Sequence, residues 1–350
     1  MGAATGASRA EKQRAVNPLP HVPAIGKTRT MVFIGFHASH EQLPPSTLLD
    51  AVVRAEQAGF DGAMCSDHLA PWSATQGESG YAWSWLGAAL ASTAFSLGVV
   101  TAPGQRYHPV ITAQAVATLE EMFPGRFWAA LGSGEAMNEH VTGDPWPPKS
   151  RRNERLAASV DAIRDLLAGR EVTRDGPITV HRARIWSRPA TPPPLFAAAV
   201  TSETAGWAAA WADGLVTVSQ PREVLDDVVS AYRDAGGRGP CILQAHIALE
   251  DSESAVTEVL REQWRHPAIP GSLWDIEQPE EFDELAGDPT DEQLRRGAIA
   301  SADPVEVAER VADLVSAGFE RVYLHGVGTD QSAFLDRAER TLLPTLRGAQ

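Results

Sequence analysis

The chain has 350 residues, a formal net charge of −15 and an apolar fraction of 43%. This length allows one large α/β domain or two smaller ones with a sizeable core. A strongly acidic surface repels phosphate backbones and anionic lipids, which argues against a nucleic acid or a membrane as the partner. A small basic pocket for an anionic small molecule is still compatible with this charge.

The two cysteines, Cys65 and Cys241, lie far apart and form no CxxC pair. This spacing supports neither a disulfide framework nor a cysteine-rich zinc site, and reduced thiols suit a cytoplasmic protein. Residues 1–30 carry no continuous apolar run, and no segment approaches the roughly 20 apolar residues that span a bilayer. We therefore expect a disordered tail over 1–30 and a single cytoplasmic domain over 31–350.

From Met31 onward, short apolar runs alternate with longer amphipathic segments. Short apolar runs predict strands, and apolar residues at helical spacing predict helices. The expected strands are 31–36, 60–65, 95–101, 126–131, 194–199, 215–218, 241–249 and 320–324. The expected helices are 46–58, 85–93, 109–122, 153–167, 201–211, 221–234, 252–264 and 304–317.

Capping residues mark the ends of several expected helices. Ser46 is the expected cap of the first helix, and Gly59 closes it. Near the other end, Asp303 and Glu306 predict a capping box, with Pro304 at the first helical position. The sequence at the helix-to-strand joint 58–61 closely resembles that at 317–320, which indicates a repeated unit.

Eight strand–helix units in succession predict a (β/α)8 TIM barrel, because parallel strands need crossover helices and about 250 residues hold eight units. An open doubly wound sheet is the alternative, but the sequence has no complete dinucleotide fingerprint. Two stretches exceed a minimal barrel. Residues 171–193, with a hairpin pattern, and the acidic residues 267–297 are expected insertions after the fourth and seventh strands.

The residues that follow the expected strands carry the candidate chemistry, because barrel enzymes place their sites at the carboxyl ends of strands. Asp67-His68 follows the second strand. A histidine titrates near neutral pH and can accept a proton from a hydroxyl group, and a neighbouring carboxylate can orient a ring. The structural alternative is a loop histidine that is satisfied by backbone groups.

A second motif, Gly132-Ser133-Gly134-Glu135, follows the fourth strand. Paired glycines let backbone amides approach a ligand, although the motif lacks the lysine ending of a nucleotide phosphate loop. A carboxyl group in a water-poor barrel mouth can stay protonated, so Glu135 is a candidate acid. The structural alternative is a tight turn.

Taken together, these motifs resemble the luciferase-like monooxygenase superfamily of flavin and deazaflavin enzymes, and most of all its branch of deazaflavin-dependent glucose-6-phosphate dehydrogenases. The resemblance covers residues 32–218, with a weaker continuation. The matching stretches are Ala38-Ser39-His40-Glu41-Gln42, Ser66-Asp67-His68 with Pro71-Trp72, Arg106-Tyr107-His108-Pro109 with Ala113-Gln114-Ala115, Leu131 to Glu139, and Trp211-Ala212-Asp213-Gly214.

The resemblance implies roles for individual residues. His68 would take a proton from the substrate hydroxyl, while a hydride passes to C5 of a deazaflavin or N5 of a flavin. Glu135 would protonate the ring system, and Trp72 and Glu41 would shape the substrate site and stabilise His68. The residues implied to contact the cofactor are Asp67, Val99, Val100, Ala102, Gly132, Ser133, Gly134, Met137, Thr201 and Ser202.

The sequence also departs from this branch. The sugar-phosphate dehydrogenases keep a lysine in the helix after the fifth strand, where this chain has Gly206, and no lysine follows Lys149. A sugar phosphate is therefore not the expected substrate. Glu203 would repel the polyglutamate tail of the deazaflavin coenzyme F420, which keeps FMN open as the alternative cofactor.

Four hypotheses remain from the sequence. The first is a flavin- or deazaflavin-dependent oxidoreductase that transfers a hydride to or from a small organic molecule, and the second is an FMN-dependent monooxygenase. The third is a metal-dependent hydrolase or isomerase, with ligands among His37, His40, His68, Glu135, His246 and His325, although the leading expectation includes no metal. The fourth is a barrel that binds a ligand without catalysis. A homodimer is compatible with the resemblance.

Overall fold

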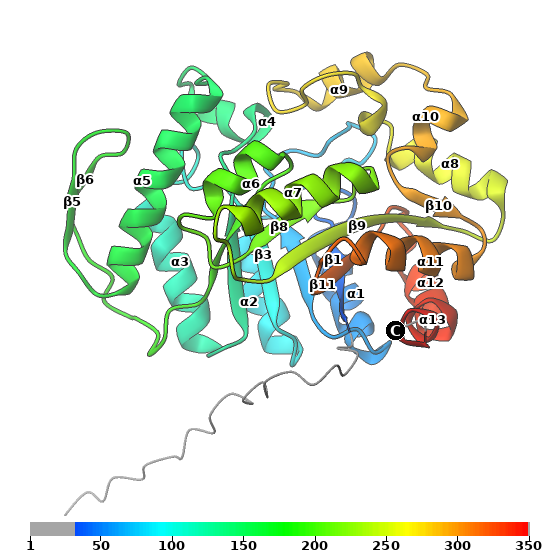
Figure 1. The fold of residues 1–350 in the computed structure, drawn as a ribbon, viewed down its shortest axis with the longest axis horizontal. Coiled ribbons are helices and arrows are strands. Elements are labelled where there is room, and N and C mark those ends of the chain that lie inside the picture. Colours follow the sequence, from blue (N-terminus) through cyan, green and yellow to red (C-terminus); the bar gives the residue numbers. More distant parts are fainter. Residues whose placement is uncertain (1–31, 349–350) are drawn as a thin grey trace, which may run out of the picture. The chain divides into compact units, whose positions relative to one another are not determined.

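A computed structural model describes residues 32–348, so the expected tail over 1–30 lies outside the described residues. Eight parallel strands form a closed ring, since the last neighbour in the sheet order, β8, also pairs with β9 (Figure 1). The expected (β/α)8 barrel is confirmed. Around the ring the strands are β1 (Phe33–Ala38), β2 (Ala63–Ser66), β3 (Leu97–Thr101), β4 (Phe127–Leu131), β7 (Leu195–Ala198), β8 (Leu215–Val218), β9 (Cys241–Leu249) and β11 (Arg321–Gly326).

Helices connect successive strands and pack around the ring. Each expected helix is present. The helix at 109–122 has the expected bounds, and the bounds of the others differ by a few residues. None of the described helices is long and apolar enough to cross a membrane. They are α1 (Pro45–Gln57), α2 (Ala82–Ser92), α3 (Pro109–Met122), α5 (Lys149–Leu167), α6 (Ser202–Ala208), α7 (Arg222–Asp234), α8 (Glu253–Gln263) and α11 (Pro304–Val315). Three short helical segments, α12 (Gln331–Arg337), η3 (Ala338–Leu342) and α13 (Leu343–Gly348), follow β11.

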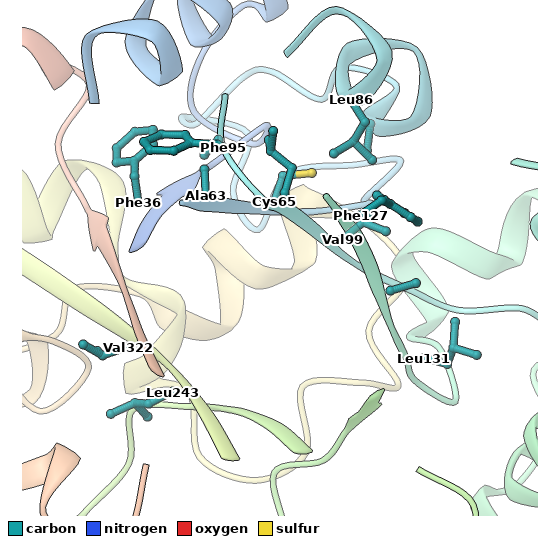
Figure 2. Packing of buried hydrophobic residues seen from close by; sticks show 14 of the residues in the cluster. Phe36, Ala63, Cys65, Leu86, Phe95, Val99, Phe127, Leu131, Leu243 and Val322 are labelled. Atoms are coloured by element: carbon teal, nitrogen blue, oxygen red, sulfur yellow. The ribbon is translucent and has the colours of Figure 1, made fainter. Parts of the chain in front are cut away.

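Side chains alternate between the two faces of each strand, as the two-residue period of a strand requires. On β2, Ala63 and Cys65 join the large core between strands and helices, whereas Met64 joins a separate cluster inside the barrel. Figure 2 shows the outer core, where Cys65 and Val99 lie near Leu86 of α2.

The interior cluster fills the amino-terminal half of the barrel. Its largest members are Met64, Trp128, Phe196, Ile242 and Tyr323, one from each of five strands. Gly98 makes room for the indole of Trp128, because a Cβ at this position would lie 2.0 Å from the ring. The barrel is therefore a packed core at this level and forms a floor for whatever lies above it.

Two expectations about helix ends are wrong in detail. Helix α1 begins at Pro45, and its N-cap Pro44 makes no side-chain hydrogen bond, so Ser46 is not the cap. Asp303 does cap α11, because its carboxylate accepts a hydrogen bond from the Val305 amide. Glu306 accepts instead from the Ser301 hydroxyl at 2.7 Å, so the second half of the expected capping box is absent.

Both expected insertions are present. Residues 171–193 contain an antiparallel hairpin of β5 (Val172–Arg174) and β6 (Val180–Ala183), which stands apart from the barrel sheet (Figure 1). Residues 267–297 form short helices beside the carboxyl end of the barrel, and β10 (Ile299–Ser301) then extends the sheet next to β9. The helical segments here are η2 (His266–Ala268), α9 (Pro279–Ala286) and α10 (Asp291–Arg295).

Candidate active site

A cavity of about 1090 Å³ opens at the carboxyl ends of the barrel strands. Its floor is the interior cluster, because the lining residues lie two positions further along the same strand faces. His325 follows Tyr323 on β11 in this way, and Ser66 follows Met64 on β2. The insertion supplies part of the wall through Pro267, Leu273, Trp274 and Asp275.

His68 lies between two carboxylates in this cavity. Its Nδ1 is 2.9 Å from Oε1 of Glu41, and its Nε2 is 3.5 Å from Oε2 of Glu135. Glu41 is fixed from its other side, because its Oε2 accepts a hydrogen bond from the Ser39 hydroxyl at 2.7 Å. A neutral His68 that donates from Nδ1 to Glu41 therefore presents a bare Nε2 to the cavity.

The two carboxylates differ in their electrostatic surroundings. Burial by itself raises the pKa of Glu41, but the charge and hydrogen bond of His68 outweigh it and leave that pKa well below its usual range. Burial raises the pKa of Glu135, and the charge of His68 offsets this only in part. For His68, burial lowers the pKa, but the charge and hydrogen bond of Glu41 dominate and raise it. Glu41 is thus the permanent anion, and Glu135 the group that holds a proton more readily.

Asn138 positions Glu135 by hydrogen bonds. Its Oδ1 accepts from the Leu69 amide at 2.7 Å, which orients the side-chain amide. Its Nδ2 then donates to Oε2 of Glu135 at 3.2 Å. The loops after β2 and β4 are therefore tied together at the two ends of the His68–Glu135 pair.

Asp67 is buried in a ring of donors beneath the cavity. Its Oδ2 accepts hydrogen bonds from Nε1 of Trp83 at 3.0 Å and from the hydroxyl of Thr101 at 2.8 Å. Its Oδ1 accepts from the Tyr107 hydroxyl at 3.2 Å and lies 3.5 Å from the Arg106 guanidinium. These contacts lock the strand end that carries His68.

The motif after β4 forms a tight cradle. Gly134 has φ of +83°, and a Cβ there would lie 3.1 Å from Cγ of Glu139, so glycine is required for both reasons. Ser133 accepts a hydrogen bond from Nζ of Lys149 at 3.1 Å. Thr201, which also lines the cavity, caps α6 by accepting from the Thr204 amide. These groups bring amides, hydroxyls and one cation to the same wall.

Aromatic rings form another part of the wall. Trp72 contacts His68 edge to face, with ring centroids 5.2 Å apart. Trp72 also contacts the second insertion, because its ring stacks on His266 with centroids 5.0 Å apart and meets Phe282 of α9 edge to face. Two further hydrogen bonds hold the insertion over the β4 loop, from the Ala136 amide to the Trp274 carbonyl and from the Trp146 indole to Asp275.

Most of the expected site residues line this cavity. They are His68, Glu135, Trp72, Glu41, Asp67, Val100, Ala102, Gly132, Ser133, Gly134 and Thr201. Three expected cofactor contacts do not line it. Val99 points into the outer core because it alternates with Val100, Met137 packs with Ile269 and Phe282, and Ser202 lies beyond the cap residue Thr201 (Figure 2 for Val99).

Several lining residues were missed by sequence reasoning. Lys149 and Arg152 lie at the start of α5, and Trp264 and His266 lie near the second insertion. Their side chains reach the cavity only through the packing of segments that follow a helix, so the rule of strand ends does not point to them. The positions of Lys149 before a long amphipathic helix and of the Trp264-Arg265-His266 cluster were the only local signals.

The residues expected for a metal centre are not all brought together. His40 packs against Trp85 and does not line the cavity, whereas His37, His246 and His325 form a separate group on β1, β9 and β11. Within residues 32–348 there is no cluster of three or more His, Cys, Asp or Glu side chains arranged to hold a metal ion.

Comparisons with known proteins agree with this architecture. A family model described as luciferase-like monooxygenase matches residues 28–321. The chain is 35% identical over 339 residues to the F420-dependent glucose-6-phosphate dehydrogenase of Intrasporangium calvum, covering 91% of this chain and 100% of that protein. It is 36% identical over 335 residues to the corresponding protein of Beutenbergia cavernae, covering 91% and 99%.

Among solved structures, an F420-dependent secondary alcohol dehydrogenase in complex with an F420-acetone adduct is similar, with a TM-score of 0.83 and 28% identity. This similarity covers 90% of the present chain and 99% of that one. The chain belongs to the luciferase-like monooxygenase family and is an oxidoreductase. The resemblance to the branch of deazaflavin-dependent dehydrogenases is thereby confirmed.

Proposed function

We propose that this protein is an F420-dependent dehydrogenase that transfers a hydride between the coenzyme and a small, unphosphorylated alcohol or its carbonyl form. The observation that carries the proposal is the placement of His68 between an ionised Glu41 and a proton-holding Glu135 at the cavity wall. This arrangement suits removal of a hydroxyl proton as a hydride leaves the same carbon.

The cavity residues fit a deazaflavin coenzyme. The cradle at Gly134 allows backbone to approach a ligand, and Nζ of Lys149 offers positive charge beside Ser133. The Thr217 hydroxyl lines the cavity and is buried without a hydrogen-bond partner in the described part of the chain. It is therefore free to form a hydrogen bond with a polar group of a bound ring system. When bound, the coenzyme would accept or donate the hydride.

The protein's own residues manage the proton. Nδ1 of His68 stays 2.9 Å from the Glu41 carboxylate, and Nε2 accepts the proton of the substrate hydroxyl. The imidazolium that forms is stabilised by the neighbouring carboxylate of Glu41, which Ser39 holds in place. Glu135, oriented by Asn138, would donate the proton that the coenzyme takes up together with the hydride.

The cations of the cavity bear on the substrate class. Gly206, which stands where the sugar-phosphate branch has a lysine, does not line the cavity, whereas its neighbour Trp207 does. All four lysine and arginine side chains that line the cavity in the described part of the chain have partners. Lys149 donates a hydrogen bond to Ser133 of the cofactor cradle, Arg296 pairs with Glu292 at 2.6 Å, and Arg106 and Arg152 each lie 3.5 Å from a carboxylate, of Asp67 and of Asp275. These partners favour a neutral substrate, although the curated relatives are named for glucose 6-phosphate.

FMN is the second candidate cofactor, and it carries the monooxygenase alternative with it. Glu203 lines the cavity on the same wall as Lys149, and its charge would oppose the polyglutamate tail of F420. Visible absorption during separate titrations with F420 and FMN tests the choice. Binding of F420 alone supports the proposal, and binding of FMN alone would replace it with a flavin enzyme.

The substitution His68→Ala tests the catalytic assignment. We expect retained fold and coenzyme binding with turnover reduced by about 10²- to 10⁴-fold, the usual contribution of a general base. Glu135→Gln should cost less, because the amide still donates a hydrogen bond. Reduction of F420, followed at its absorption band with propan-2-ol and with glucose 6-phosphate, gives the rates. Unchanged turnover in His68→Ala would remove this residue from the reaction.

The homodimer expected from the family resemblance stays a prediction, and sedimentation velocity would test it.

A further inference from the structure

Three histidines lie on the part of the barrel that the proposed function leaves unused. The proposed cofactor contacts that line the cavity come from β2, β3, β4, β7, β8, the loops after them and the start of α5. His37, His246 and His325 come from β1, β9 and β11, which are the three remaining, consecutive strands of the ring. The residues proposed to hold the cofactor lie at the other strands, which leaves this wall for a substrate.

Hydrogen bonds fix which nitrogens of this group carry protons. Nε2 of Gln42 donates to the Val327 carbonyl, which can only accept, so the amide oxygen of Gln42 faces the other way. That oxygen lies 2.7 Å from Nε2 of His325, which must therefore donate. Burial lowers the pKa of His325 well below its usual value, so the ring is neutral and its Nδ1 is bare.

The same reasoning extends one ring further. Nδ1 of His246 lies 2.9 Å from the bare Nδ1 of His325, so His246 is the donor in this pair. Burial lowers the pKa of His246 to about 3, so the ring carries no second proton. Its Nε2 is consequently a hydrogen-bond acceptor. Nε2 of His246 makes no hydrogen bond to any described residue. It is also not sealed off from solvent, so a ligand in the cavity can reach it.

His246 and His68 lie at the two ends of one wall of rings. Trp72 contacts His68, His266 stacks on Trp72, Trp264 lies 4.4 Å from His266, and His246 lies 4.5 Å from Trp264, between ring centroids. Each ring in this series contacts the next, so the wall is continuous from His68 to His246 and a substrate that lies along it passes both histidines.

We propose that His246 determines substrate specificity by accepting, at Nε2, a hydrogen bond from a second hydroxyl group of the substrate. The first hydroxyl is the one at His68, so the inference rests on the proposed function and narrows its substrate class to diols and polyols. A phosphate or carboxylate group offers only acceptors to a bare nitrogen and is rejected at this position. A simple alcohol leaves the acceptor unpaired.

Matched alcohols test the proposal in the full chain loaded with F420. Pentan-2-ol is compared with pentane-1,4-diol, and butan-2-ol with butane-1,3-diol, by kcat/KM for F420 reduction. We expect wild type to prefer a diol by roughly tenfold, the worth of one hydrogen bond. His246→Phe keeps a ring against Trp264 and should bring this ratio near one, whereas His246→Gln should restore it through its amide oxygen.

A second measurement does not depend on turnover. In ¹⁵N histidine spectra of the loaded wild-type protein, we expect His246 to be protonated at Nδ1 and bare at Nε2. Pentane-1,4-diol should shift the Nε2 signal, and pentan-2-ol should not.

The outcomes separate the two proposals. A diol preference that persists in His246→Phe, a ring protonated at Nε2, or a loss of F420 binding in His246→Phe would overturn the role of His246. If no alcohol is oxidised but the diol still shifts Nε2, the proposed dehydrogenase reaction fails while the binding role of His246 stands.

Discussion

Glu41 and Glu135 are two glutamates beside one histidine, and their surroundings give them opposite protonation behaviour. The His68 ring and the Ser39 hydroxyl both stabilise the charge of Glu41, so its pKa falls although it is buried. Glu135 receives a longer contact from His68 and a single amide bond, so burial prevails and its pKa rises. Such a divergence between neighbouring acids is the usual basis of an acid–base pair.

Replacing Glu41 by Gln tests this balance. The substitution removes the charge that raises the pKa of His68, so burial then lowers that pKa. His68 stays deprotonated to a lower pH, and the acid limb of kcat/KM against pH should move downward. Because the imidazolium loses its stabilising anion, kcat should fall on the order of 10²-fold. Ser39→Ala, which removes only one hydrogen bond to Glu41, should shift the profile less. An unmoved acid limb in Glu41→Gln would contradict the pairing.

Asp67 has a structural role as a buried hydrogen-bond acceptor, although the sequence pairs it with His68 in a catalytic motif. Its side chain is fully buried and meets donors from Trp83, Thr101 and Tyr107, with Arg106 nearby. Asp67→Asn should lower the free energy of unfolding by about 3 kcal/mol, because it leaves buried donors and a cation without their anion. Urea unfolding measures the change. Asp336→Asn, which breaks an exposed pair with Arg54, should cost less than about 1 kcal/mol. Equal losses would contradict a special role for Asp67.

Among the secondary-structure elements, the alternation of strands and helices could be predicted because each element carries its own apolar period. The exact helix starts could not, because neighbours compete for the same groups. Glu306 bonds to Ser301 instead of closing a box with Asp303. On β3, the family resemblance implied that both Val99 and Val100 contact the cofactor, although a strand turns successive side chains to opposite faces. That correction was available from the period alone.

A pair of substitutions tests the two helix starts. Asp303→Ala should destabilise the protein by about 1 kcal/mol, because the Val305 amide at the start of α11 loses its acceptor. Ser46→Ala should have almost no effect, since Ser46 is exposed within α1 and makes no cap. Chemical denaturation of both variants gives the comparison. A loss at Ser46 as large as that at Asp303 would place the cap of α1 where the sequence first indicated it.

At the scale of the whole molecule, the sequence predicted the barrel and the site residues that follow its strands, because strand ends are local features. The remaining site residues depend on segments that fold back from a distance. Trp264, His266 and Trp274 reach the cavity only when residues 264–297 pack over the loops after β2 and β4. No spacing in the sequence encodes that contact, so it could not be predicted from one chain.

Buried histidines make the stability of the whole molecule depend on pH. Burial lowers the pKa of His37 to about 4 and those of His246 and His266 to about 3, and that of His325 lies well below its usual value. Below about pH 6.5 the unfolded chain binds protons that the native state refuses, so stability falls as pH decreases. Each histidine contributes on the order of 1.4 kcal/mol per pH unit to this fall. Burial raises the pKa values of Glu135 and Glu139, which opposes it.

Urea unfolding at pH 7, 6 and 5 measures this slope. His266→Phe keeps an aromatic ring against Trp72 and should flatten the slope by about one proton. His181→Phe, at an exposed position on the β5–β6 hairpin, should leave it unchanged. A stability that is constant from pH 7 to 5 would contradict the neutral state of the buried group.

The packed layer of Met64, Trp128, Phe196, Ile242 and Tyr323 closes the amino-terminal end of the barrel. The cavity above this layer is closed at the amino-terminal end, so ligands enter and leave only through the opening at the strand ends. Residues 267–297 cover part of that opening. Two reactants that share one opening must bind and dissociate one after the other. Whichever of the two reactants lies deeper must arrive first and leave last, and the order of binding is therefore imposed by the shape of the barrel rather than by the affinity of either reactant.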